Sequence, residues 1–436
     1  MRDFLNRLEQ AQDIRYVDRE VDPTFELAAV VQASQQDSSS AILFRKVAGT
    51  RFPVVSNLYG DDERLAQLLG VNADDFGEGW WRAMQRLPQM ADSAFCTVPA
   101  DPNLVRVTLP ELPHIIWQEK DGGPYISAGI FYARDPETGV GNLSFCRSLM
   151  VDDRLVSCFV PFHDLADYQR RAEALGKTLE VAVLIGAPPE VFLAACASLP
   201  LDMDEMVFAA AIKGEAIEMR PCSTIDLDVP ADTQIVIEGR VRPREREPEG
   251  PFGEFMGYYG DVNMQGYVID VLAVDTLPDA VFHGLLCGSA EDMVPLNRAF
   301  AARAYVALRE TMPDVVLEVS GNPIFFVTVV RIRKTSDDQP AEIIARVFER
   351  GARWTSMCIV VDEDVDPHDT AAVLDAYVTR GRVDERLSVL TDDQLPRRRT
   401  GGRVGIDATT PMGERDRTER TRIPGAEAID LRQYLA

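Results

Sequence analysis

Two glutamates lie on either side of a tight turn in PEGPFGEFMGYYG, the segment from Pro248 to Gly260. The Gly-Pro-x-Gly sequence between Glu249 and Glu254 excludes a helix and predicts a structured turn or loop. Aromatic side chains follow Glu254 at once. A solvated loop has little use for such side chains, so the segment predicts the lip of a site. The alternative is a pair of surface acids in a tight turn.

Arg147, in the strand-like run GNLSFCRSLM, could join these acids into a reactive set. If Glu249 and Glu254 both face Arg147, the arginine can hold a substrate carboxylate and keep one acid as its anion. The second acid then has a raised pKa and becomes a proton donor near neutral pH. Asn142 precedes Arg147 by five residues, which places the two on opposite faces of a regular strand, so a shared site requires a bulge or turn. The alternative is an ordinary exposed arginine on a strand edge.

Three further segments carry polar residues of types that can contact a metal ion or a phosphate. His163 follows an apolar run in FVPFHDL, and Glu205 opens a predicted helix in LDMDEMVFAAAIKG. Arg403 follows a Gly-Gly turn in RRRTGGRVGIDAT, where backbone N–H groups and the guanidinium could hold a phosphate. Each has a structural alternative: a satisfied histidine, an acid at a helix N-terminus, and a basic surface loop.

The composition limits the partners. The chain has 436 residues and a net charge of −25, which argues against nucleic acid or an anionic membrane as the main partner but permits a small anionic substrate. No run reaches the roughly 18 apolar residues of a membrane span, and the N-terminus has no signal-peptide pattern. Seven scattered cysteines without a CxxC pair are typical of a reducing cytoplasm and speak against finger-type zinc.

The elements that must position these residues form three regions. Helix-like and strand-like runs mix up to a proline-rich passage near Pro110, and from about Tyr125 the pattern is mostly strand with two helical insertions. That pattern predicts a barrel-like sheet core, and the alternating helices and strands after Ala290 predict an α/β layer. We predict a mixed α+β and α/β multidomain chain with a tail that is mobile or packs on another subunit. The predicted domains are an N-terminal α/β region, a central sheet domain and a C-terminal α/β domain, at residues 1–115, 116–295 and 296–436.

Five segments in one order together resemble the UbiD-like decarboxylases, of the 3-octaprenyl-4-hydroxybenzoate carboxy-lyase type. These enzymes use prenylated FMN to remove CO₂ from aromatic and α,β-unsaturated acids. The segments are NLSFCR, DEMVFAAAIKG, MRPCSTIDLDVPADTQIVIEG, PEGPFGEFMGYYG and GRVGIDAT, with His163 at a familiar distance after the first. Five motifs in one order are far more specific than any one alone.

The resemblance implies how the cofactor is held. Asn142, His163 and Glu205 would bind a divalent metal, with Mn²⁺ expected, that bridges to the cofactor phosphate, and a potassium ion nearby is in keeping with the family. Arg403 stands where the family often has a lysine that touches the phosphate. The central domain is expected to be a split β-barrel. The residues expected to line the flavin are Phe145, Cys146, Arg147, Phe159, Val160 and Pro161.

The resemblance also implies a catalytic set in which Arg147 orients the substrate carboxylate, Glu249 tunes its neighbours and Glu254 donates a proton. Loss of CO₂ leaves electrons on carbon that no side chain can accept, so a cofactor is required. The expected reaction is reversible, non-oxidative decarboxylation of an aromatic, heteroaromatic or α,β-unsaturated acid. The quinone-precursor branch typically has Arg-Gly-Gly after the histidine, whereas this chain has Asp-Leu-Ala from Asp164, so a smaller or specialised acid is expected.

The expected setting is a cytoplasmic homodimer or homohexamer that receives its cofactor from a flavin prenyltransferase, without nucleic acid or membrane partners. Two alternatives stay open. One is a flavin-free, metal-dependent hydrolase or lyase that uses Asn142, His163 and Glu205 directly. The other is a non-catalytic flavin-binding scaffold, which would have no need to retain the arginine and the two glutamates.

Overall fold

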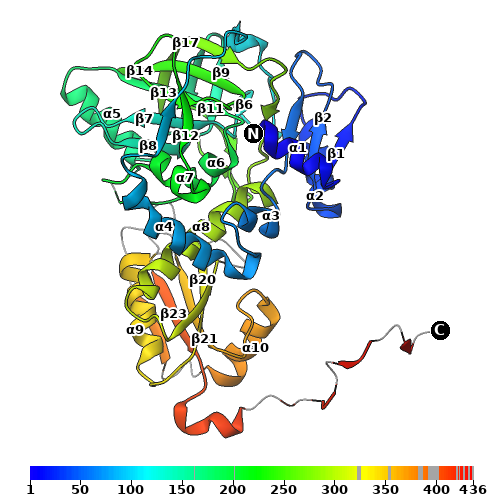
Figure 1. Ribbon diagram of the computed structural model, residues 1–436, viewed down its shortest axis with the longest axis vertical. Helices are drawn as coiled ribbons and strands as arrows, with labels where there is room; N and C mark the ends of the chain where they lie inside the picture. The colour runs from blue at the N-terminus through cyan, green and yellow to red at the C-terminus, as the bar shows by residue number, and fades with distance from the viewer. Residues whose placement is uncertain are drawn as a thin grey trace. The chain divides into compact units, whose positions relative to one another are not determined.

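The computed structural model divides into two compact units, Met1–Val306 and Ala307–Ala436, which are described separately (Figure 1). Among the described residues, every helix is too short or too polar to cross a bilayer. The described residues are 1–161, 163–200, 202–321, 326–351, 355–381, 386–390, 402–418, 421, 423–425, 428–430 and 433–434.

A large antiparallel sheet forms the centre of the first unit (Figure 1). Its strand order is β6(Tyr125–Ile126), β9(Ser148–Val151), β10(Arg154–Ser157), β17(Asn263–Thr276), β14(Ile235–Glu249), β11(Leu179–Ile185), β7(Ile130–Arg134) and β8(Gly141–Phe145), and β5(Val105–Val107) also pairs with β17. Strand β11 is apolar along most of its length because both of its faces are buried. Ala182 and Leu184 join one hydrophobic cluster, and Val181 and Val183 join the other.

The two ends of this sheet are joined by short links. Strand β8 stands at one end of the strand order and β9 next to the other end, yet two residues, Cys146 and Arg147, connect them. A link from Phe145 to Ser148 spans at most about 11 Å, so the ends of the sheet must curl towards each other. Arg147 therefore lies where the two ends meet.

Helices cover both faces of the central sheet. Helix α5(Asp164–Ala174) packs on β7, β8, β11 and β14. Helices α7(Glu205–Lys213) and α6(Pro189–Ala195) pack on β8, and α4(Phe76–Met90) packs on α7. Asp204 caps the start of α7 by accepting a hydrogen bond from the Met206 amide at 2.7 Å. Gly214 ends α7 with a φ of 78°, which favours glycine.

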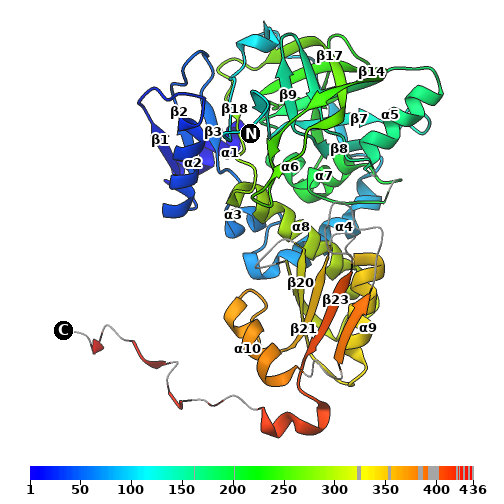
Figure 2. The same cartoon turned by 180° about the vertical axis from the view of Figure 1, so that it is seen from behind.

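The N-terminal residues form a smaller layer, which lies to one side of the central sheet in both views (Figures 1 and 2). Its sheet runs β1(Ile14–Val17), β2(Ala41–Phe44), β3(Val54–Ser56) and β18(Phe282–His283). Its helices are α1(Arg2–Gln10), α2(Glu26–Asp37) and α3(Asp62–Gln67). A separate small sheet of the first unit has the strand order β13(Asp228–Pro230), β12(Ile217–Pro221) and β4(Phe95–Thr97). Short 3₁₀ turns occupy Ala73–Asp75 and Leu109–Glu111.

Buried Glu291 ties this layer to α8(Ala290–Arg309). Its carboxylate accepts hydrogen bonds from the Asn57 and Leu58 amides at 2.5 and 2.7 Å, and pairs with His283 Nε2 at 2.9 Å. The first turn of α8 is thereby fixed to β3 and β18.

The second unit is an α/β layer, as the sequence predicts. Its sheet order is β19(Val316–Ser320), β20(Val327–Ile332), β21(Met357–Asp362), β23(Arg403–Ala408) and β22(Leu387–Leu390), with β20, β21 and β23 parallel. Helix α9(Gln339–Arg346) continues into a π-helical turn, Val347–Gly351, and packs on β21 and β23, while α10(Thr370–Arg380) packs on β23. A 3₁₀ helix follows at Met412–Arg417.

The predicted helices and strands are largely confirmed, with two differences that matter for the site. The strand-like run GNLSFCRSLM divides into two strands, β8 and β9, and the run YISAGIFYARD likewise divides into β6 and β7. Both breaks have the same cause, because each run crosses from one end of the sheet order to the other. The mixed, multidomain α/β class is confirmed. Part of the predicted tail, including Arg397 and Gly401, lies outside the described residues.

Candidate active site

Arg147 and the two glutamates of the hairpin segment form one hydrogen-bonded group. Arg147 Nε and Nη2 donate to Glu249 Oε1 and Oε2 at 2.8 and 3.1 Å. Arg147 Nη1 donates to Glu254 Oε1 at 2.9 Å. The bidentate contact fixes the plane of the guanidinium relative to Glu249. Residues more than a hundred positions apart thus meet at the junction between β8 and β9.

The local fold explains how the glutamates reach Arg147. Glu249 ends β14, and the chain turns into a small hairpin of β15(Phe252–Gly253) and β16(Tyr259–Gly260). The Glu254 amide donates to the Tyr258 carbonyl at 2.9 Å, and the Gly257 amide donates to the Glu254 carbonyl at 2.9 Å. Gly257 has a φ of 78°, so the tight turn favours glycine there. The predicted structured turn is confirmed.

The group is mostly dry. The side chain of Glu249 is fully buried, and those of Arg147 and Glu254 are each 13% exposed. Burial alone would lower the pKa of Arg147, but its hydrogen bond to Glu249 and the surrounding negative charges raise that pKa above its usual value. Arg147 therefore stays a cation, and its Cζ lies 4.9 Å from the Phe252 ring centroid, within cation–π range.

A second polar group lies around the start of β8. Asn142 Nδ2 and the Leu143 amide each donate to Glu205 Oε2 at 3.2 Å. Ser144 Oγ donates to Asn142 Oδ1 at 2.7 Å. Glu205 is the first residue of α7, and burial, with smaller contributions from the charges of Asp164 and Asp204, raises its pKa to about 8.

His163 stands at the N-cap of α5, the helix that packs on β8. Its carbonyl accepts hydrogen bonds from the Ala166 and Asp167 amides at 3.1 and 3.2 Å. The three predicted metal ligands therefore lie on elements that contact one another through β8. Among the described residues, the structure has no cluster of three or more His, Cys, Asp or Glu side chains that could hold a metal.

The residues expected to line a flavin connect the two groups. Phe145 ends β8 and contacts Phe192 edge to face at 4.9 Å, and buried Cys146 follows it. Phe159 stacks on Tyr267 at 4.4 Å, and the next two residues, Val160 and Pro161, are half-buried and exposed. The Cys158 amide donates to the Arg147 carbonyl at 3.2 Å, so these two segments run side by side.

Arg403 is the first residue of β23, in the second unit. Its Nη1 donates to the Phe348 carbonyl at 2.8 Å, and its Cζ lies 5.5 Å from the Phe348 ring centroid. These contacts tie the start of β23 to the π-helical turn. The phosphate role of Arg403 stays a prediction.

Three residues near the catalytic group were not predicted. Tyr125 Oη donates to Glu249 Oε1 at 2.9 Å, and Asp121 Oδ1 accepts from the Gly253 amide at 2.9 Å. Half-buried Asp292, on α8, has a raised pKa because of desolvation, with Glu254 among the negative charges that contribute. Their sequence surroundings, KDGGPY and SAEDM, carry no pattern that links them to a distant hairpin.

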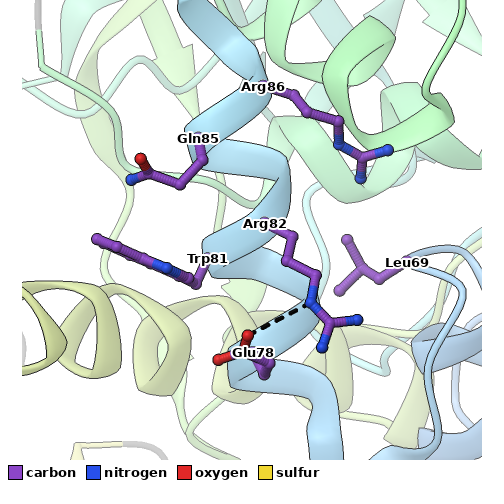
Figure 3. Close-up of a pocket in the computed structure, with 6 residues that line it drawn as sticks. All are labelled: Leu69, Glu78, Trp81, Arg82, Gln85 and Arg86. Atoms are coloured by element: carbon purple, nitrogen blue, oxygen red, sulfur yellow. Dashed lines mark hydrogen bonds and ion pairs between the residues drawn. The ribbon is translucent and has the colours of Figure 1, made fainter. Parts of the chain in front are cut away.

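A separate hollow lies along α4 (Figure 3). It has a volume of about 460 Å³, and Arg82 Nε donates across it to Glu78 Oε1 at 3.3 Å. It is lined by Leu69, Glu78, Trp81, Arg82, Gln85 and Arg86. None of these residues belongs to either polar group, so this hollow is not the predicted site.

Comparison with known families shows matches over most of the chain. The N-terminal, Rift-related and C-terminal domain models of 3-octaprenyl-4-hydroxybenzoate carboxy-lyase match residues 5–84, 95–290 and 296–408. Anhydromevalonate phosphate decarboxylase of Methanothermobacter thermautotrophicus is 30% identical over 96% of this chain and 99% of its own. The enzyme of that name from Methanosarcina mazei is also 30% identical, over 97% and 99%.

Solved structures show the same similarity. The UbiD-class enzyme HmfF of Pelotomaculum thermopropionicum, in an evolved dimeric form in complex with prenylated FMN, superposes with a TM-score of 0.89 at 31% identity. That match covers 100% of this chain and 99% of the HmfF chain. Vanillic acid decarboxylase of Sedimentibacter hydroxybenzoicus superposes with a TM-score of 0.82 at 26% identity, over 98% and 96% of the two chains.

Proposed function

The chain belongs to the UbiD family of prenylated-FMN-dependent carboxy-lyases, and we propose that it decarboxylates an aromatic, heteroaromatic or α,β-unsaturated acid, reversibly and without net oxidation. One observation carries the proposal: Arg147 hydrogen-bonds to both Glu249 and Glu254. Relatives named for anhydromevalonate phosphate and vanillic acid support this range of substrates.

Each of the three side chains has a separate role in the proposed reaction. Arg147, held as a cation in a dry site, orients the substrate carboxylate. Fully buried Glu249 keeps the guanidinium in place through its bidentate contact. Glu254 delivers a proton to the carbon that lost CO₂, and the 13% of its side chain that reaches solvent permits reprotonation between turnovers.

Prenylated FMN supplies, when bound, the electron acceptance that loss of CO₂ requires. The residues that would line it lie on two adjacent segments, from Phe145 to Arg147 and from Phe159 to Pro161. The short links between the ends of the central sheet support a split-barrel arrangement for this domain. Arg403 is proposed to contact the cofactor phosphate, as its place after the Gly-Gly turn suggests.

Asn142, His163 and Glu205 would hold Mn²⁺ beside the cofactor phosphate. Their donor set, one carboxylate, one amide oxygen and one imidazole nitrogen, fits a divalent ion of this kind. The raised pKa of Glu205 supports the fit, because two amide groups donate to the buried carboxylate, Asp164 and Asp204 are negative neighbours, and a bound cation would offset its burial. A potassium ion is proposed nearby.

The test is to express the chain with a flavin prenyltransferase and follow CO₂ release from a panel of acids. The panel includes vanillate, furan carboxylates, acrylates and anhydromevalonate phosphate. The proposal requires visible flavin absorbance and release of CO₂ from at least one of them. A colourless, metal-loaded protein would favour the flavin-free hydrolase or lyase, and a coloured protein inert towards all of them would favour the scaffold.

Glu254→Gln tests the proton donor. We expect the variant to bind flavin as the unchanged protein does and to lose turnover by about 100-fold or more, since general acid catalysis contributes on the order of 10²–10⁴. Glu180→Gln is the matched control, because Glu180 is also an acid of the central sheet paired to an arginine, Arg240. Equal CO₂ release by the Glu254 and Glu180 variants would remove Glu254 from its role.

Cytoplasmic location and a homo-oligomeric state, dimer or hexamer, are parts of the same proposal. The dimeric form of the Pelotomaculum enzyme supports a dimer as one of these states. Light scattering of the purified protein would measure the state directly.

A further inference from the structure

A short segment behind the glutamate hairpin makes several contacts with it. The Gly122 amide donates to the Pro251 carbonyl at 2.8 Å. A Cβ on Gly122 would lie 2.4 Å from the Gly250 carbonyl oxygen, so only glycine permits this approach. The segment from Gln118 to Tyr125, here called the backing segment, therefore lies directly against the turn that separates the two glutamates.

Asp121 joins the backing segment to the hairpin. Its Oδ1 accepts from the Gly253 amide and its Oδ2 accepts from the Gln118 amide, both at 2.9 Å. One carboxylate thus bridges two backbone amides of segments that are far apart in sequence. Gly253 directly precedes Glu254, so the bridge restricts the position of the backbone next to the proposed proton donor.

Tyr125 acts on the other glutamate. Its side chain is fully buried, and its hydroxyl donates to Glu249 Oε1, the same oxygen that accepts from Arg147 Nε. Its ring packs on Phe252, with centroids 4.6 Å apart. The Phe252 ring in turn lies 4.9 Å from Arg147 Cζ. Tyr125 therefore restrains both the carboxylate and the hairpin that carries the next acid.

We infer that Asp121 and Tyr125 are positioning residues that hold Glu249 and Glu254 at Arg147, an inference that rests on the proposed function. The salt bridge fixes the Glu249 carboxylate relative to the Arg147 guanidinium. It leaves the two side chains free to move together relative to the rest of the site. The Tyr125 hydroxyl and the Asp121 bridge attach this salt-bridged pair to β6 and to the backing segment. Productive geometry at a reacting carbon tolerates little displacement, so loss of either attachment slows the chemical step.

Tyr125→Phe removes the hydroxyl and keeps the ring that packs on Phe252. We expect kcat to fall by about 10- to 100-fold, with KM within about twofold, flavin absorbance intact and an unchanged melting temperature. Tyr59→Phe is the matched control, because Tyr59 is also buried and its hydroxyl has no hydrogen-bond partner among the described residues. A kcat equal to that of the Tyr59 variant would overturn the role of Tyr125.

The effect of Asp121→Asn is measured by amide hydrogen exchange of the hairpin, which needs neither flavin nor substrate. The Gln118 and Gly253 amides bind different oxygens of Asp121, and an asparagine replaces one of these oxygens with an NH₂ group that cannot accept. We expect exchange in the hairpin, residues 252–260, to become about tenfold faster. Asp101→Asn is the control, since Asp101 accepts two hydrogen bonds from Asn103 in an exposed turn. Unchanged hairpin exchange would overturn the role of Asp121.

The two readouts separate this inference from the proposed function. If the unchanged protein releases no CO₂ from any acid, the proposed function fails, and the hydrogen-exchange comparison still decides whether Asp121 holds the hairpin. If it decarboxylates an acid and the Tyr125 and Asp121 variants match their controls in both readouts, the proposed function stands and the positioning inference is wrong.

Discussion

Glu254 has a half-buried acidic neighbour, Asp292, whose charge state matters for stability. Asp292 accepts from the Gly288 amide at 2.7 Å and from the Cys287 thiol. Desolvation raises its pKa, and the charges of Glu291 and Glu254 contribute in the same direction. An acid whose pKa is higher in the folded than in the unfolded state binds its proton more tightly when folded. Its stabilising contribution is fully present below the usual carboxyl pKa of about 4 and is lost as pH rises through the raised value.

Asp292→Asn removes this pH dependence. We expect the melting temperature of the variant to rise relative to that of the unchanged protein as pH increases from about 4 to 7. The measurement is thermal unfolding at a series of pH values in that range. Asp152→Asn, whose side chain is 88% exposed, serves as control and should follow the unchanged protein. A constant difference between the Asp292 variant and the unchanged protein would contradict the assigned cause.

At the residue scale, the sequence predicted the residues of the catalytic group but not the residues that support them. The types and spacing of Glu249, Glu254 and the intervening turn predicted a site that Arg147 could join, and the resemblance implied a catalytic role for each of the three. The roles of Asp121 and Tyr125 could not be predicted, because they depend on the approach of two segments more than a hundred residues apart. Such an approach has no local periodicity that a pattern could detect.

At the scale of elements, the loop between β18 and α8 packs against the glutamate hairpin. Gly288 has a φ of 77°, and a Cβ there would lie 3.0 Å from the Phe255 carbonyl oxygen and 3.3 Å from its Cα. The backbone of this loop therefore touches the residue that follows Glu254. Close packing of this loop on the hairpin therefore requires a glycine at position 288.

Gly288→Ala should displace Phe255 and slow decarboxylation by about tenfold or more, because Glu254 moves with it. Gly176→Ala is the matched control: its φ is also positive, at 65°, but nothing lies within 4 Å of its added Cβ. The control should lose about 1 kcal/mol of unfolding free energy to backbone strain and keep its turnover. If both variants retain full activity, the contact with Phe255 does not position Glu254.

The elements also show why a pattern can identify a strand and miss its end. The run GNLSFCRSLMV is strand-like throughout, and its division at Cys146 and Arg147 follows from sheet topology rather than from residue propensity. The same division removes the objection that Asn142 and Arg147, five residues apart, would face opposite sides of one strand. Helix α4 was not predicted from the sequence, and it contains Pro88, a residue type that usually ends or kinks a helix.

At the scale of the whole molecule, the charge of −25 opposes the approach of an anionic substrate. The catalytic group does not reverse this field, since Arg147 is one cation beside two glutamates. Salt screens such repulsion, with a Debye length that falls from about 30 Å at 0.01 M to about 8 Å at 0.15 M.

We therefore expect kcat/KM for a carboxylate substrate to rise with ionic strength over that range, while kcat changes little. The measurement is steady-state CO₂ release at several concentrations of an inert salt. The corresponding neutral amide, tested as an inhibitor, should bind with no such dependence. A fall in kcat/KM as salt increases would show that a local positive field, rather than the net charge, governs substrate entry.

The contacts of Arg147 also limit what can enter beside it. A guanidinium carries five N–H groups. Three of them point at Glu249 and Glu254, one from each nitrogen, which leaves a single N–H on each terminal nitrogen. That remainder suffices for the two oxygens of one incoming carboxyl group and for no other anion. A diacid would thus need a separate cation for its far end, and the identity of that cation would decide which diacids the protein accepts.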